Sequence, residues 1–73
     1  MRKKETKDSS WVKEIRGERG NLYVETKTGH FYVYYNVPNK IIDELINVDS
    51  PGKYINKHIK GIYSEELIPN FPE

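Results

Sequence analysis

LYVETKTGHFYVYY, residues 22–35, is the stretch of sequence that decides the fold. Its first half alternates apolar and polar side chains with a period of two, which is typical of a strand with one buried face. Its second half, residues 31–35, is a run of aromatic and β-branched residues, which strands favour. Thr28 and Gly29 separate the two halves and have the chemistry of a turn. The stretch therefore predicts a β-hairpin.

A further strand precedes this hairpin. Residues 11–16 read WVKEIR and combine β-branched and aromatic side chains with charged ones. Residues 17–21 contain two glycines and an asparagine, which predict a turn. Three strands joined by two turns predict a three-stranded antiparallel meander.

The pattern becomes helical after Pro38. Ile41, Ile42, Leu45 and Val48 recur at the spacing of one helix face, over about three turns. A proline just before or at the start of a helix is favourable because the first helical N–H groups have no partner inside the helix. The stretch predicts a first helix that begins just after Pro38.

A second helix is expected from Ser50 onward. Ser50 is a good N-cap residue, and Pro51 suits the first helical position. Ile55, Ile59 and Ile62 then form one apolar stripe. Because the strands come first and the helices follow, the fold class is α+β, with both helices packed on one face of the sheet.

The two ends differ from the middle in composition. Residues 1–8 have no apolar side chain after Met1 and carry four basic and two acidic residues, so a disordered basic N-terminal arm is expected. Residues 64–73 hold two prolines and three glutamates and predict a loosely packed acidic tail. The α+β domain is expected to span residues 9–63.

Bulk composition excludes several classes of protein. The chain has no cysteine, which rules out disulfides and thiolate metal sites. No apolar run approaches the roughly 18 residues of a membrane span, and the basic start leads into no secretory h-region. A cytoplasmic protein is therefore expected. The net charge of +1 is low for a dedicated duplex-DNA binder, whose affinity depends on phosphate contacts.

An ordered set of residues runs through all of these elements. Its members are Ser9-Ser10, Val12, Ile15, Leu22-x-Val24, Gly29, Tyr32-x-Tyr34, Val37-Pro38, Leu45, Ser50-x-Gly52-x-Tyr54-Ile55-Asn56, Ile59-Lys60 and Tyr63. Together they resemble the KTSC domain, a small module named after the C-terminus of some lysyl-tRNA synthetases and also found as a free-standing bacterial or phage protein. The family usually has aromatic residues near Gly17 and in place of Thr26 and Ile55, where this chain does not. The resemblance implies RNA binding and brings no active-site residues.

The hairpin can close in two registers. A two-residue loop at Thr28-Gly29 groups Leu22 and Val24 with Phe31, Val33 and Tyr35. A three-residue loop at residues 27–29, with glycine in the left-handed conformation, groups them with the Tyr-x-Tyr pair at 32 and 34. A slip of one residue exchanges the two faces completely. The three-residue loop is favoured because positions 22, 24, 32 and 34, which recur in the family, then all face the helices.

The face that the helices leave uncovered is a candidate interaction surface. In the favoured register it carries Tyr23, Phe31, Val33 and Tyr35, with Trp11 as a further candidate. Contiguous exposed apolar surface usually marks an interaction site. Three interpretations remain open: partial cover by the termini, a protein interface such as a homodimer, and stacking of unpaired RNA bases with nearby cations on the phosphates.

Three lysines of the second helix form another candidate surface. Lys53, Lys57 and Lys60 recur at spacings of four and three, so they share one helix face, called the lysine stripe below. A solvated helix face is the commoner explanation of such a stripe. The stripe could instead extend a nucleic-acid track if it lies near the aromatic face.

Catalysis has little support in the sequence. His30 and His58 have no cysteine or carboxylate at a recognised metal or nucleophile spacing. Asp43 and Glu44 are adjacent on a helix and therefore diverge in direction. Gly17 and Gly20 do not match a phosphate-binding loop, because no helix follows them. No catalytic residue, cofactor or metal is expected.

The sequence therefore predicts a non-catalytic module that binds single-stranded or structured RNA. The alternative is a protein-interaction or homo-oligomerising module, including a phage-encoded modulator of a host factor. The expected partners are RNA, a second copy or a host protein, and no membrane. The expected binding residues are Trp11, Lys13, Tyr23, Phe31, Tyr35, Lys53, Lys57 and Lys60.

Overall fold

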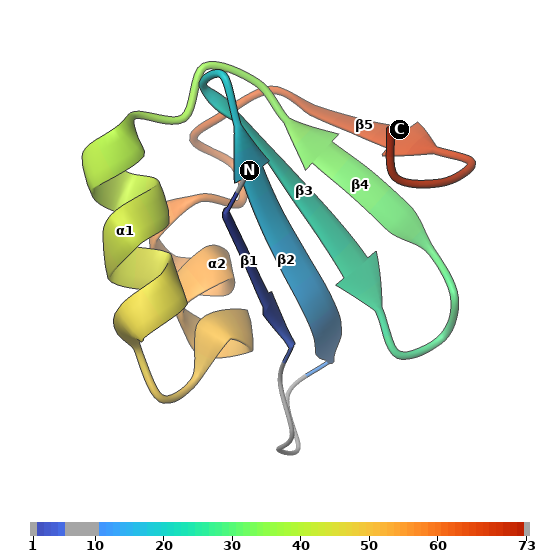
Figure 1. The fold of residues 1–73 in the computed structure, drawn as a ribbon, viewed down its shortest axis with the longest axis horizontal. Helices are drawn as coiled ribbons and strands as arrows, with labels where there is room; N and C mark the ends of the chain where they lie inside the picture. Colours follow the sequence, from blue (N-terminus) through green and yellow to red (C-terminus); the bar gives the residue numbers. More distant parts are fainter. Residues whose placement is uncertain (1, 6–10, 73) are drawn as a thin grey trace.

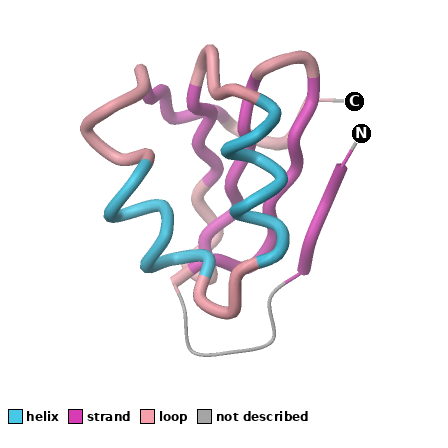
Figure 2. The backbone as a smooth tube through the Cα atoms, turned by 90° about the vertical axis from the view of Figure 1, so that its left-hand side faces the viewer, coloured by secondary structure: helices cyan, strands magenta, loops and turns pink. Residues whose placement is uncertain are grey.

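The structure is a computed structural model that describes residues 2–5 and 11–72 of the chain. The strands are β1 (Arg2–Glu5), β2 (Val12–Glu18), β3 (Asn21–Thr26), β4 (Phe31–Tyr34) and β5 (Glu65–Ile68), and the helices are α1 (Asn39–Asn47) and α2 (Pro51–His58). The strands form one antiparallel sheet in the order β1-β2-β3-β4-β5. Both helices lie on the same side of this sheet (Figures 1 and 2). The predicted α+β fold is therefore confirmed.

The number of strands differs from the prediction, because segments from both ends extend the three-stranded meander. Arg2–Glu5, part of the expected disordered arm, pairs with β2 from Gly17 to Glu14. The rest of that arm lies outside the described residues. Glu65–Ile68, part of the expected loose tail, pairs with β4. The edges of a three-stranded sheet present unpaired backbone N–H and C=O groups, and these two segments satisfy them.

The β3–β4 hairpin has the favoured three-residue loop. Leu22 faces Tyr34 and Val24 faces Tyr32 across the two strands. The Thr26 N–H donates to the His30 carbonyl at 2.8 Å, which leaves residues 27–29 as the loop. Gly29 has φ of +91°, a conformation that residues with a Cβ rarely adopt. The predicted register is therefore the observed one.

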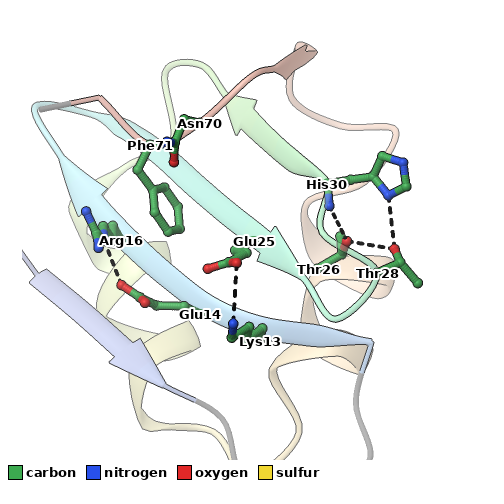
Figure 3. Close-up of polar contacts among 9 residues, drawn as sticks. All are labelled: Lys13, Glu14, Arg16, Glu25, Thr26, Thr28, His30, Asn70 and Phe71. Atoms are coloured by element: carbon green, nitrogen blue, oxygen red, sulfur yellow. Dashed lines mark hydrogen bonds and ion pairs between the residues drawn. The ribbon is translucent and has the colours of Figure 1, made fainter.

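Polar side chains also close this loop. The Thr28 hydroxyl lies 3.0 Å from both the Thr26 hydroxyl and Nδ1 of His30 (Figure 3). The His30 N–H donates to the Thr26 hydroxyl at 3.0 Å. His30 thus takes part in a local network that holds the turn.

The core lies between the sheet and the helices. Tyr34, the largest fully buried side chain, is 1% exposed and is a member of the Tyr-x-Tyr pair. Its hydroxyl hydrogen-bonds to Glu65, and burial together with this bond raises the pKa of Tyr34 above its ordinary value. The β4 ring is thereby connected to β5. The other buried members of this core are Val12, Ile15, Leu22, Val24, Val37, Ile42, Leu45, Ile55 and Ile59.

The helices begin where the sequence predicts. α1 follows Pro38 and buries Ile42 and Leu45, and α2 has Ser50 at its N-cap position with Pro51 at the start. Ser50 caps α2 through its backbone, since its carbonyl accepts from the Tyr54 N–H at 3.1 Å. Within the described residues, neither helix is long and apolar enough to cross a membrane.

The outer face is the name used below for the side of the sheet away from the helices. Because strand side chains alternate, the register assigns to it the residues of β2, β3 and β4 that do not face the core. They are Glu14, Arg16, Glu18, Asn21, Tyr23, Glu25, Phe31 and Val33.

Replacing Gly17 with alanine should destabilise the fold, because α1 packs directly on this glycine. A Cβ built at Gly17 would lie 2.6 Å from Cγ2 of Ile42, a side chain that is 1% exposed. We expect Gly17→Ala to lower the free energy of unfolding by about 1–3 kcal/mol in chemical denaturation. The same change in an Ile42→Ala background should cost much less, since the clashing methyl is gone. Equal costs in the two backgrounds would contradict this packing.

Candidate functional site

The lysine stripe lies on the side of α2 that points away from the core. Pro51, Gly52 and Ile55 are the buried residues of the helix. Lys53 and Lys57 are exposed, as helical spacing requires for positions opposite Ile55. Lys57 and His58 lie in the last turn, where a cation interacts favourably with the helix dipole.

Lys60 lies just beyond the end of α2, within reach of an aromatic ring. Its N–H donates to the Ile55 carbonyl at 2.7 Å, so the backbone still follows the helix end. Its Nζ lies 5.8 Å from the centroid of the Trp11 ring, which is within cation–π distance. Trp11 is half-buried and packs against the core cluster. The placement of Trp11 on the outer face, considered in the sequence analysis, is therefore wrong.

A β-bulge accounts for the burial of Val12 at the start of β2. The pairing of β2 with β3 is irregular between Val12 and Glu14, so the alternation of faces is interrupted there. Val12 and Ile15 are both fully buried although they are three positions apart. Trp11, immediately before the strand, also lies against the core.

The segment from residue 50 to residue 64, which includes α2, contains three lysines and no carboxylate. The salt bridges between described residues join Lys13 to Glu25 and Arg16 to Glu14, and neither involves the lysine stripe. The stripe is thus a local concentration of positive charge on a chain whose net charge is only +1.

Tyr54 is the point where α2 meets α1. Its hydroxyl donates to Glu44 Oε2 at 3.1 Å, and its ring packs against the His58 ring at a tilt of 41°, with centroids 4.6 Å apart. Burial, followed by the hydrogen bond to Glu44, raises the pKa of Tyr54. Tyr54 and His58 therefore have structural partners at the border of the lysine stripe.

The outer face holds the other predicted binding residues. Tyr23 lies between Arg16 and Val33 in the sheet, and Tyr35 donates its hydroxyl proton to Glu66. This hydrogen bond raises the pKa of Tyr35. Lys13 is 64% exposed, with its Nζ 3.7 Å from Glu25. The structure thus divides the predicted residues between two surfaces, with Trp11 and the lysine stripe on the helix side.

Phe71 covers part of the outer face. Its ring meets Phe31 edge-on, with centroids 5.0 Å apart and an interplanar angle of 79°. The guanidinium of Arg16 lies 4.1 Å from the centre of the same ring. Figure 3 shows Phe71 reaching from the C-terminal segment toward the sheet beside Arg16. Val33, which lies beside Phe31 on the same face of β4, is only 2% exposed.

Carboxylates surround this covered aromatic cluster. Glu14 accepts from Nε of Arg16 at 2.6 Å, and Glu25 pairs with Lys13. Glu66 accepts from Tyr35 on the neighbouring strand. Three carboxylates therefore accompany two cations here, whereas the segment from residue 50 to residue 64, which includes α2, has no carboxylate.

Phe71, Glu14 and Glu66 are the residues that sequence reasoning missed at this surface. Leu67, Ile68 and Phe71 are apolar residues in a segment expected to be a polar tail, and this was the available signal. Where these residues pack depends on the pairing of β5 with the edge of β4, and no local sequence pattern reveals this pairing.

The comparisons with known proteins identify the family. Residues 9–63 match the KTSC domain model, and the chain belongs to the KTSC domain family. The resemblance predicted over the same residues is thereby confirmed.

The relatives are much longer proteins. The chain is similar to proteins named lysine–tRNA ligase from Trichormus variabilis, Nostoc sp. and Nostoc punctiforme, with identities of 38%, 36% and 32% over 63 residues. Each match covers 84% of this chain and 11% of the relative. The chain therefore spans about a tenth of the length of these curated relatives.

Truncating Phe71 should weaken the fold modestly and uncover Val33. Aromatic pairs and cation–π contacts together predict that Phe71→Ala lowers the free energy of unfolding by about 1 kcal/mol. The Val33 amide, in the middle of β4, should then exchange faster with solvent. Leu67→Ala is the matched control, because Leu67 is 60% exposed in the same region, and its cost should stay below about 0.5 kcal/mol. Equal effects of the two changes would show that Phe71 does not cover the outer face.

Proposed function

We propose that the chain is a non-catalytic, cytoplasmic module that binds single-stranded or structured RNA through α2 and Trp11. The observation that carries this proposal is the lysine stripe beside a half-buried indole, on a surface formed by a segment without carboxylates. Lysine ammonium groups neutralise phosphates, and an indole is a platform for an unpaired base.

The distance between Lys60 and Trp11 supports this division of roles. A cation 5.8 Å from the ring centre is close enough to contact the phosphate of a nucleotide whose base stacks on the accessible part of Trp11. Lys53 and Lys57 extend the positive charge along α2, so that neighbouring phosphates could follow the helix. Flexible lysine side chains suit such contacts because they place charge without fixing a base sequence.

The outer face is a poorer RNA site. Its exposed aromatic area is reduced by Phe71, and Glu14, Glu25 and Glu66 lie around what remains. Negative side chains repel phosphates, while the lysine stripe attracts them. We therefore assign RNA contacts to Trp11 and the lysine stripe, and not to Tyr23, Phe31 or Tyr35.

The relatives give independent support. Their name describes enzymes that act on a tRNA, and the matched part is a small fraction of each relative. A module carried by such a protein is consistent with a supporting role in RNA binding. This argument concerns RNA as a class and does not extend to a ligase activity of this chain.

The RNA proposal predicts that Lys57→Ala weakens RNA binding and reduces its dependence on salt. Removing one phosphate contact should lower the slope of log affinity against log salt by about 0.7 for single strands. Fluorescence anisotropy with a labelled mixed-sequence RNA, at several salt concentrations, measures both effects. Trp11 is the only tryptophan, so quenching of its fluorescence reports directly on base stacking.

Two matched variants make this experiment specific. Lys40→Ala removes the same charge from α1, and Tyr23→Ala truncates an aromatic residue of the outer face. Both should bind RNA as the unaltered chain does. If Lys57→Ala and Lys40→Ala weaken binding equally, or if RNA leaves Trp11 fluorescence unchanged, the proposed surface is wrong.

A protein-interaction module is the second candidate, and two exposed side chains favour it. Ile62 is 64% exposed and Leu67 is 60% exposed, and both are large and apolar. Such residues suit contacts with a second copy or with a host protein. Light scattering would separate the candidates, because apolar association persists at high salt whereas phosphate-driven binding is lost.

A further inference from the structure

The outer face carries a contact site for an aromatic side chain, called the ring site below, and this site lies away from the surface assigned to RNA. Arg16 of β2 and Phe31 of β4 contact the ring of Phe71, at 4.1 Å and 5.0 Å from its centre. Val33, which lies two residues after Phe31 on β4 and on the same face, is 2% exposed. All three residues belong to strands of the sheet. An aromatic ring thus finds a ready site here.

The orientation of Arg16 is fixed by a second contact. Its Nε donates to Glu14 Oε2 at 2.6 Å, and the Glu14 side chain is only 12% exposed. A guanidinium held in this way keeps its plane available for stacking on a ring. The guanidinium is therefore preorganised, which lowers the entropy cost of binding.

The segment that occupies the ring site, residues 69–72, contacts the sheet through the side chain of Phe71. β5 ends at Ile68, and no backbone hydrogen bond from residues 69–72 to the sheet is found among the described residues outside helices and strands. The Phe71 N–H donates to the side chain of Asn70, within the segment itself, at 2.8 Å. Because the backbone of this segment does not pair with the sheet, another polypeptide could replace it without breaking strand hydrogen bonds.

The charge around the ring site indicates which kind of segment would replace the one that carries Phe71. Glu14, Glu25 and Glu66 outnumber Arg16 and Lys13 on this surface. Residues 69–73 have no cation, and Glu73 adds one more negative charge in sequence. A segment with lysine or arginine beside its aromatic residue would complement the face better than the chain's own end does. An RNA strand would not, because its phosphates carry the wrong sign.

We propose that the outer face is a docking site for a protein segment in which an aromatic residue is followed by proline and a cation. The chain's own Phe71-Pro72 occupies this site in cis and competes with such a partner. A tethered competitor of this kind is present at a high effective concentration, so it weakens binding in trans. The site is independent of the RNA surface on α2.

The test uses the full chain with Phe71→Ala and a capped peptide of sequence proline–asparagine–phenylalanine–proline–lysine. Binding is followed by NMR through the methyl groups of Val33. We expect saturable shifts for the Phe71→Ala chain and binding about tenfold weaker or more for the unaltered chain. A peptide ending in glutamate should bind more weakly, and one with alanine in place of phenylalanine should not bind.

Two further outcomes keep the test decisive. Phe71→Leu retains an apolar cover without an aromatic ring, and it should give an intermediate affinity if Phe71→Ala proves too unstable. The proposal is overturned if a folded variant shows no saturable shift at Val33, or if the alanine peptide shifts Val33 equally. It is also overturned if single-stranded RNA, and not the peptide, shifts Val33. Loss of RNA binding at α2 would leave this result unaffected, so the two proposals fail separately.

Discussion

The register of the β3–β4 hairpin is the constraint on which the rest of the structure depends. Side chains of a strand alternate between two faces, so the length of one loop decides which rings of β4 enter the core. The loop at residues 27–29, with Gly29 at φ of +91°, sends Tyr32 and Tyr34 toward the helices. Phe31 and Val33 are then directed to the outer face. The side chains present on each of the two surfaces follow from this arrangement.

The apolar side chains on the two faces of the sheet are covered in different ways. On the helix side, α1 and α2 bury Tyr34 and the aliphatic residues of β2 and β3. On the outer face, which α1 and α2 leave uncovered, Phe71 of the C-terminal segment packs against Phe31. The helices leave their lysines in solvent, whereas the returning segment lies among carboxylates. The molecule thus has a basic surface and an aromatic surface of opposite electrostatic character, which suit different kinds of partner.

Local patterns were sufficient to predict much of this fold. Period-two alternation located β3, the aromatic run located β4, and Pro38 and Ser50-Pro51 located the starts of the helices. The register required the family resemblance as well, because hydrophobicity alone favoured the other loop. β5 was missed, since a strand that begins with two glutamates is stabilised by the edge it joins and not by its own composition. The position of Trp11 was missed because this residue precedes the first residue of β2, where the alternation of strand faces no longer assigns a side.

The cross-strand pairing of β3 with β4 is the most direct test of this account. NMR contacts between backbone protons of the two strands identify which residues face each other. The account predicts contacts between Leu22 and Tyr34 and between Val24 and Tyr32. Contacts between Leu22 and Tyr35 and between Val24 and Val33 would contradict it, because the rings of β4 would then have exchanged faces.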